Sequence, residues 1–378
     1  MKKETGLFGF ASACALLCML GGITEAATGY GLSPPFDVKS VRAKTGGRDT
    51  KAFACAASPA PMKDLHMESF YRKDDATSSA VDPQAYAVYK AATKPASVYE
   101  VGLESMANRY VRSNPPRPEL AQCPLDWLAT WAKGGALLGD VNKNGEYTRK
   151  WLLGSIASAW LQIRDEPSLD SRKKADVTNW IREVAGRVRD DFSRDTQLKS
   201  RQNNHLYWAA WSVAAAGMVT GDRGLFDWGM EKARFGINQI QADGTLPNEL
   251  ARGRRAYLYH LFSAMPLFML ANAADKNGID LFQENNGALR RLGNVLLGDL
   301  GNPSYFREIT REEQDMAHAG TRSDLGWVEI YRQHYDDPRA DAALRAFRPM
   351  KQSRFGGNIT LLYGQLAVKA PQKRDNKG

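Results

Sequence analysis

Apolar residues recur at spacings of three and four along most of the chain after about residue 85, a pattern typical of helices that bury one face. In "LDWLATWAKGGALL", for example, Trp127 and Trp131 lie four residues apart. The pattern predicts helices over residues 85–112, 123–138, 148–164, 173–192, 205–220, 222–242, 254–274, 284–298 and 340–348.

The links between these helices are short and hold turn-forming residues, as in "RDEPSLDS", "TGD", "ADGTLPNE" and "KNGIDL". Short links make neighbouring helices antiparallel, so we expect an all-α fold whose helical hairpins close into a toroid or superhelix. A groove would then form where the helix ends meet the loops. No sequence repeat of fixed period supports a regular solenoid, and neither strand alternation nor a hairpin signal recurs.

The two ends of the chain and the region before the first long helix differ from this pattern. Residues 1–27 resemble a cleaved secretory signal, with Lys2 and Lys3, an apolar run and small residues at Ala26 and Ala27. A retained anchor is the alternative. Residues 28–64 predict an extended segment, 65–84 a polar loop that could act as a lid over the domain of residues 65–365, and 366–378 a polar tail.

An exported chain with these residues has a restricted set of partners. Its 378 residues allow one large domain or two smaller ones, and 9 Trp with 14 Tyr suit a ring-shaped ligand such as carbohydrate. The formal charge of +9 favours a polyanion, and export excludes nucleic acid, which leaves an acidic polysaccharide or an anionic membrane surface. The alternative is that the excess positive charge is scattered.

Without the signal, Cys55 and Cys123 remain, either as a disulfide or as buried thiols.

The segment "NNHLYW" (203–208) is a cluster of polar and aromatic residues directly before "AAWSVAAAG", a run of mostly small, apolar residues. Asn203 suits a helix N-cap, which places Asn204 and His205 in the first turn, where free backbone N–H groups favour an anion. A sugar carboxylate is therefore one expected occupant. The alternative is that His205 only caps the helix or packs.

A second cluster lies in "DGTLPNELARGRRAYLYH" (243–260), where Arg252, Arg254 and Arg255 precede Tyr257 and Tyr259. Because the tyrosines are two residues apart on a helix, one can face a groove while the other packs. Arginines beside a tyrosine can bind a carboxylate and move a proton near it, although a solvated basic face is an equal alternative. The sequence contains no HxxxH, HExxH, CxxC, GxSxG, P-loop or GxGxxG motif, so no metal is expected.

Four segments together resemble a known family: "RKWLLGSIASA", "NNHLYWAAWSV", "DGTLPNELARGRRAYLYH" and "ENNGALRRLG". They are similar to periplasmic, mannuronate-preferring alginate lyases over most of the chain, from about Cys55 to Thr360. The resemblance implies an incomplete (α/α) toroid with a deep groove, and β-elimination of uronate polymers without a required cofactor. It also implies a periplasmic location, no membrane anchor, alginate as the substrate, and other alginate export proteins as further partners.

The resemblance assigns roles to individual positions. It makes Asn204 the neutralising amide, His205 the catalytic histidine, Arg252 the catalytic arginine and Tyr259 the catalytic tyrosine. It pairs Cys55 with Cys123. The implied substrate contacts are Trp151, Arg354 (before the Gly-Gly turn of "KQSRFGGNIT"), Tyr71, Arg72, Lys73, Asn203 and Tyr207.

The loop at residues 65–84 departs from the family pattern. Family members have Ser-Lys-Tyr where this chain has Ser69-Phe70-Tyr71, so Arg72 or Lys73 would have to supply the cation of the lid. On this basis, Phe70→Lys would raise activity or leave it unchanged. The broader alternatives are a lyase for another uronate polymer, a non-catalytic polyuronate-binding protein and an exported helical protein of the cell envelope.

Overall fold

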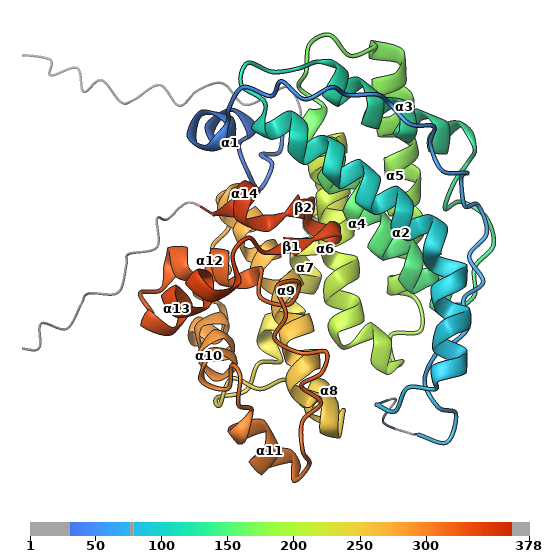
Figure 1. Cartoon of the computed structure of the whole chain (residues 1–378). Coiled ribbons are helices and arrows are strands. Elements are labelled where there is room, and N and C mark those ends of the chain that lie inside the picture. Colours follow the sequence, from blue (N-terminus) through green and yellow to red (C-terminus); the bar gives the residue numbers. More distant parts are fainter. Residues whose placement is uncertain (1–30, 76, 78, 365–378) are drawn as a thin grey trace, which may run out of the picture.

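The computed structural model describes residues 31–75, 77 and 79–364. The predicted signal (1–27) and the predicted tail (366–378) therefore lie outside the described residues. Within them, the fold is an incomplete (α/α) toroid made almost entirely of helices (Figure 1). The principal helices are α1 (Val38–Thr45), α2 (Pro83–Arg112), α3 (Glu119–Lys133), α4 (Lys143–Ile163), α5 (Ser171–Ser193), α6 (Asn204–Thr220), α7 (Arg223–Asn238), α9 (Ala256–Asp275), α10 (Glu284–Gly298), α12 (Trp327–His334) and α13 (Pro338–Phe347).

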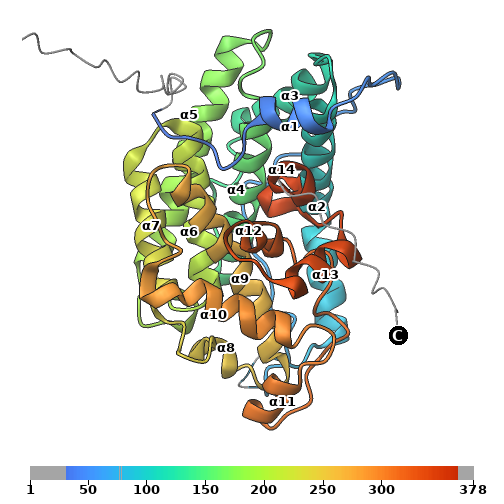
Figure 2. The ribbon, with the colours of Figure 1, turned by 90° about the vertical axis from the view of Figure 1, so that its left-hand side faces the viewer.

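The helices form an inner and an outer layer, and their composition explains the division. Helices α6 and α9 are apolar on all sides and almost fully buried, as expected of inner helices. Outer helices such as α3, α5, α7 and α10 bury a single stripe. Figure 2 shows α10 crossing in front of α9, with α6 and α7 to one side. Helices that follow one another along the chain, such as α6 and α7, pack against each other, as the short links predict.

Two boundaries differ from the predicted helices for identifiable reasons. Helix α3 ends at Lys133 and not at residue 138, because the chain turns through Gly135 and Leu137, both at positive φ. Ala136 and Leu137 are apolar because this turn is buried, not because it is helical. The segment 28–64 is not wholly extended either, since Asp37 caps the short helix α1 through the backbone N–H groups of Lys39 and Ser40.

The C-terminal part of the domain holds elements that the periodicity did not predict. Helix α12 was missed, and so were the short elements α8 (Pro247–Leu250), α11 (Ser304–Thr310) and α14 (Ile359–Tyr363). Strands β1 (Lys351–Gln352) and β2 (Gly357–Asn358) form a small antiparallel hairpin, which no hairpin signal in the sequence predicted. Its turn contains the 3₁₀ helix η3 (Ser353–Phe355) and the first glycine of the predicted Gly-Gly pair. The second glycine begins β2, and both have φ +92°.

A disulfide between Cys55 and Cys123 joins the N-terminal segment to α3, with the Cα atoms 5.6 Å apart. The prediction of this pair is confirmed. The indole N–H groups of Trp127 and Trp131 donate to the carbonyls of Ala56 and Pro59 at 2.8 and 2.9 Å. The periodic tryptophans of α3 therefore also hold the chain segment that the disulfide anchors.

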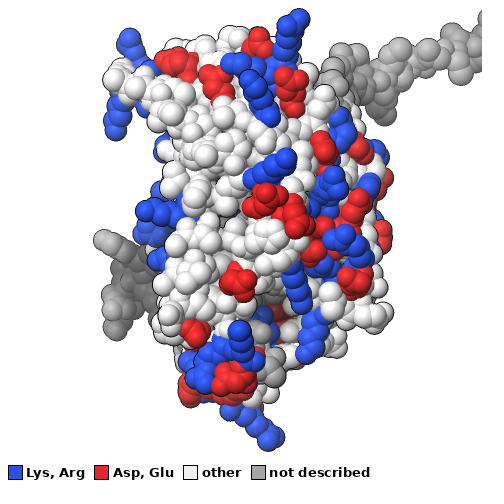
Figure 3. All heavy atoms as spheres, turned by 90° about the vertical axis from the view of Figure 1, so that its right-hand side faces the viewer, with Lys and Arg blue, Asp and Glu red and all other residues white. Residues whose placement is uncertain are grey.

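The charged side chains of one face do not form a continuous basic patch. Figure 3 shows Lys and Arg interspersed with Asp and Glu on this face. Exposed ion pairs also occur among the described residues, such as Lys173 with Asp126 and Arg223 with Asp227. On this face, at least, the scattered-charge alternative holds. Among the described residues, no helix is both long and apolar enough to cross a membrane.

Candidate active site

The N-cap of α6 is Asn203, as the sequence predicts. Asn203 Oδ1 accepts a hydrogen bond from the backbone N–H of His205 at 3.1 Å. This contact makes Asn203 a capping residue, and it is mostly buried. The cap fixes the direction in which the next two side chains, Asn204 and His205, leave the helix.

The carboxylate at this helix end belongs to the protein itself. Glu249 Oε1 accepts hydrogen bonds from the backbone N–H of Asn204 at 2.9 Å and from its side-chain Nδ2 at 3.0 Å, while Oε2 lies 3.1 Å from the same Nδ2. Ser263 donates a further hydrogen bond to Oε1 at 3.2 Å. The expectation that these N–H groups are free for a sugar carboxylate is therefore wrong. Asn204 is fully buried, and its Oδ1 has no partner among the described residues.

Glu249 is a functional candidate that the sequence analysis missed, although it lies in the turn "LPNE". Burial raises its pKa, and the hydrogen bonds from Asn204 act in the opposite direction. A buried carboxylate is tolerated only when donors surround it, which explains why Glu249, Asn204 and Ser263 face one another. Glu249 thus holds the Asn204 amide in place.

His205 is partly exposed and lies against α4. Its ring stacks on Tyr147 with the centroids 3.9 Å apart, and it lies 5.9 Å from the ring of Trp151. Its Nδ1 is 3.0 Å from Lys150 Nζ. Burial, followed by the charge of Lys150, lowers the pKa of His205 well below its usual value, so the imidazole is neutral at pH 7. Lys150 is a second residue that the sequence analysis missed, because it falls within an apolar helical stripe.

Tyr259 and Arg252 form the other half of the site. The guanidinium carbon of Arg252 lies 3.6 Å from the centroid of the Tyr259 ring, and the Tyr259 hydroxyl is hydrogen-bonded to that of Tyr71. The alternation predicted for the two tyrosines is confirmed. Tyr259 is partly exposed, whereas Tyr257 is fully buried and donates to the carbonyl of Leu296 at 3.2 Å.

The loop before α2 reaches this second half of the site. Its ends are joined by a bridge between Tyr71 and Val81, and Arg252 Nε donates to the carbonyl of Thr77 at 2.8 Å. Arg255 lies 3.5 Å from the Tyr71 hydroxyl and pairs with Asp315 at 3.0 Å. In this arrangement the loop covers Tyr259 as a lid would.

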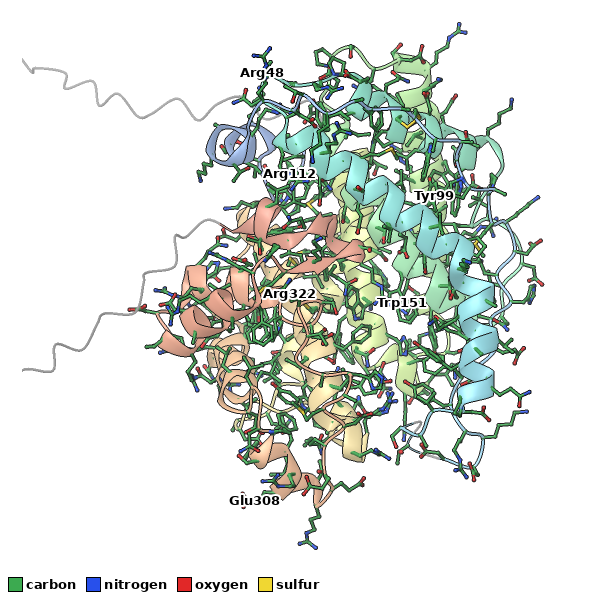
Figure 4. All side chains as sticks on the ribbon, in the orientation of Figure 1. Arg48, Tyr99, Arg112, Trp151, Glu308 and Arg322 are labelled. Carbon is green, nitrogen blue, oxygen red and sulfur yellow. A yellow bond between two sulfur atoms is a disulfide. The ribbon has the colours of Figure 1, made fainter. Side chains whose placement is uncertain are left out.

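A wall of aromatic rings connects the two halves. Trp151 lies 6.4 Å from Phe262, and Phe262 lies at the same distance from Tyr259, so the rings run from His205 to Tyr259. The guanidinium carbon of Arg354 is 4.3 Å from the Trp151 ring centroid. Figure 4 shows Trp151 between α2 and the helices of the opposite half of the molecule. The structure therefore gathers His205, Trp151, Arg252, Tyr259 and Arg354 around one place, each partly exposed.

Other predicted contacts lie elsewhere. Tyr207 is 1% exposed and packs against Gly236 in the core, so the prediction that it contacts substrate is wrong. Arg72 pairs with Asp74 at 2.6 Å within the loop, and both side chains are exposed. Lys73 is also exposed. Neither cation occupies the place beside Tyr259, which Arg252 fills. Among the residues that the structure describes, no group of His, Cys, Asp and Glu could hold a metal ion.

Comparisons with known proteins show the family to which the chain belongs. A model described as alginate lyase matches residues 66–306. An alginate lyase from Cobetia marina is 36% identical over 356 residues, which cover 92% of this chain and 93% of the relative. The chain belongs to the alginate lyase family. An alginate lyase from Pseudomonas putida is 35% identical over 375 residues, covering 96% of this chain and 98% of the relative.

Solved structures of the alginate lyase family share the fold. Alginate lyase A1-III from Sphingomonas species A1 is 26% identical, with a TM-score of 0.74 and coverage of 88% of this chain and 95% of that one. A variant of alginate lyase A1-III complexed with tetrasaccharide gives a TM-score of 0.77 at 26% identity, covering 88% and 96%. The predicted toroid is confirmed.

The packing of Phe70, at the position where the sequence resemblance implies a lysine, gives a reason to revise the expected effect of replacing it. Its ring lies 4.4 Å from Tyr71 and 5.0 Å from Tyr89 of α2, so it holds the loop on the helix. Because an aromatic pair contributes about 0.5–1.5 kcal/mol, we now expect Phe70→Lys to lower activity about two- to tenfold. Initial rates of product formation test this, with Phe70→Tyr as the control that keeps the ring. Equal or higher activity of Phe70→Lys would show that the loop does not depend on this contact.

Proposed function

We propose that this protein cleaves alginate by β-elimination at 4-linked β-D-mannuronate. The products would be oligosaccharides with a 4-deoxy-4,5-unsaturated uronate at the new non-reducing end. The observation that supports this best is the position of the Tyr259 phenol, which contacts both the Arg252 guanidinium and the Tyr71 hydroxyl. The tetrasaccharide bound to a variant of alginate lyase A1-III supports an oligosaccharide ligand for this fold.

The reaction needs a neutralised C6 carboxylate before a side chain can remove the weakly acidic C5 proton. At the Tyr259 end of the aromatic wall, Arg252 supplies a cation for this carboxylate. At the Trp151 end, the neutral His205 supplies a ring N–H. Donors aimed at developing negative charge are worth about 10²–10³ each in rate. Glu249 already accepts hydrogen bonds from the backbone and side-chain N–H groups of Asn204. We therefore assign Asn204 no direct contact with the sugar carboxylate. Its contribution to neutralisation is to orient its neighbour His205.

Tyr259 is assigned as both base and acid. In β-D-mannuronate the C5 proton and the C4 oxygen lie on one face of the ring, so a single group can serve both. The Tyr259 phenolate takes the C5 proton, the C5–H electron pair forms the C4–C5 double bond, and the C4–O4 bond breaks. O4 then takes the proton back from Tyr259 and becomes the new reducing-end hydroxyl of the neighbouring sugar.

The surroundings of Tyr259 act on its ionisation in opposing ways. Burial raises the pKa of Tyr259, Tyr71 raises it further, and Arg252 lowers it. A phenolate would therefore depend on the Arg252 cation and on a hydrogen bond donated by Tyr71. Trp151 and Arg354 are assigned as contacts of the sugar chain, because they are partly exposed beside His205.

We also propose that the protein acts in the periplasm after cleavage of residues 1–27. The Cys55–Cys123 disulfide supports an oxidising compartment, because such bonds persist there and are rare in the cytosol.

Incubation with polymannuronate and polyguluronate blocks separately tests the proposal. The conjugated double bond of the product absorbs in the ultraviolet, and we expect a faster rise with polymannuronate. Equal or faster cleavage of polyguluronate would overturn the mannuronate preference. Cleavage of hyaluronate or pectate alone would indicate another uronate polymer, and binding without any product would indicate a polyuronate-binding protein.

A further inference from the structure

Lys150 is a buried lysine without a carboxylate partner. Its side chain is 0% exposed, and no carboxylate among the described residues forms an ion pair with it. The nearest acidic residue on its helix, Glu146, pairs with Arg201 at 2.6 Å and with Arg194 at 3.2 Å. The hydrogen-bond partner that the structure gives to Lys150 Nζ is Nδ1 of His205, at 3.0 Å.

Aromatic rings supply the rest of the environment of Lys150. Nζ lies 4.2 Å from the ring centroid of Trp151, 4.4 Å from that of Tyr147 and 5.2 Å from that of Phe192. The faces of such rings attract a cation and favour the ammonium form. An ammonium group has three N–H donors and no acceptor, so it can only donate to the His205 ring.

We propose that Lys150 is a positioning residue that donates to Nδ1 of His205 and thereby keeps the proton of the neutral imidazole on Nε2. In this tautomer, the nitrogen that Lys150 does not contact is a hydrogen-bond donor. It can stabilise the sugar carboxylate, but it has no lone pair with which to accept a proton from C5.

The consequence concerns specificity and rests on the proposed function. In a guluronate residue the C5 proton and the C4 oxygen lie on opposite faces, so elimination needs a base opposite Tyr259. His205 is the group that could serve, and the contact with Lys150 removes its basic nitrogen. Lys150 therefore restricts the site to mannuronate.

The charges around His205 agree with a single ring proton. Burial, followed by Lys150 on α4, Arg252 before α9, Arg201 before α6 and Lys143 at the start of α4, lowers the pKa of His205. Burial also lowers the pKa of Lys150, with Arg354 and Arg201 in the same direction and Glu146 opposing them. A neutral Lys150 amine that accepts from Nδ1–H is the alternative arrangement.

Nitrogen-15 NMR of the imidazole rings tests the tautomer without any need for activity. The signals of His205 are assigned as those lost in His205→Ala, among the five histidines of the chain. We expect an unprotonated Nδ1 and a protonated Nε2 in the full wild-type chain. A proton on Nδ1 would overturn the proposal. If His205→Ala fails to fold, the signals lost in His205→Gln give the same assignment.

The effect on specificity is measured with Lys150→Met, which keeps the length and the apolar stem of the side chain. We expect the ratio of kcat/KM for polymannuronate to kcat/KM for polyguluronate to fall at least about tenfold. This change is smaller than the rate enhancement that a general base typically provides, because His205 would act as a base in only part of the molecules. The control is Lys143→Met, which removes an exposed cation of the same helix and should leave the ratio within about twofold. Parallel loss with both polymers would mean a structural role only. Failure of the wild type to cleave either polymer would instead reject the proposed function, while the NMR result would stand by itself.

Discussion

Replacing Tyr259 by phenylalanine is expected to lower turnover of polymannuronate at least about a thousandfold, because it removes the group that acts as both base and acid. The ring itself remains, so its contacts with Arg252 and Phe262 are kept and the fold should be little affected. The hydroxyl of Tyr71 loses this partner but keeps Arg255 at 3.5 Å, and Tyr71 is partly exposed.

The matched control for this variant is Tyr257→Phe. Tyr257 lies two residues away on the same helix and is fully buried, and its hydroxyl donates to Leu296 on the side away from the site. Its loss should cost about 1 kcal/mol of stability and leave turnover unchanged. Ultraviolet absorbance of the unsaturated product gives the rates, and thermal unfolding gives the stabilities. Near-normal activity of Tyr259→Phe would remove the proposed mechanism.

His205→Ala is expected to lower turnover by a similar factor of at least about a thousand, because it removes a neutralising donor and the partner of Lys150. The variant leaves the buried Lys150 amino group without its hydrogen-bond partner, so thermal unfolding is measured beside the rate. His318→Ala, at an exposed position near Asp315, is the control and should behave as wild type.

A second variant at this position separates two roles of the histidine. Glutamine can donate through its side-chain amide but cannot serve as a base, so His205→Gln should recover part of the polymannuronate rate lost in His205→Ala. If glutamine and alanine were equally inactive while both remained folded, the assignment of His205 as a donor would be wrong.

Much of the fold was predictable because helix formation and burial leave a local pattern. The limits of α2, α5, α6 and α10 agree with the periodicity to within about two residues, since caps and turns at their ends are also local signals. Helix α12 and the hairpin of β1 and β2 were missed, because elements this short have too few residues for a period to show.

The candidate site was predictable only in part. Tyr259 could be told from Tyr257 in principle, since alternate residues on a helix face different ways, but which of them was exposed required the structure. Tyr207 was misplaced because a polar aromatic residue in a buried helix looks the same in sequence as one at a groove. Lys150 gave no signal, because a lysine within an apolar stripe is usually exposed at its tip.

The sequence by itself determined the long helices, the capped start of α6, the cysteine pair and the residue types available for acid–base chemistry. These depend on residues close together in the chain, or on a pairing with few alternatives. Only the tertiary structure decided that Glu249 fills the N-terminus of α6 and that Lys150 contacts His205, because each pair joins residues about 45 or 55 positions apart. Such contacts arise from the packing of whole helices, and a single side chain is too small a part of that packing to reveal its partner.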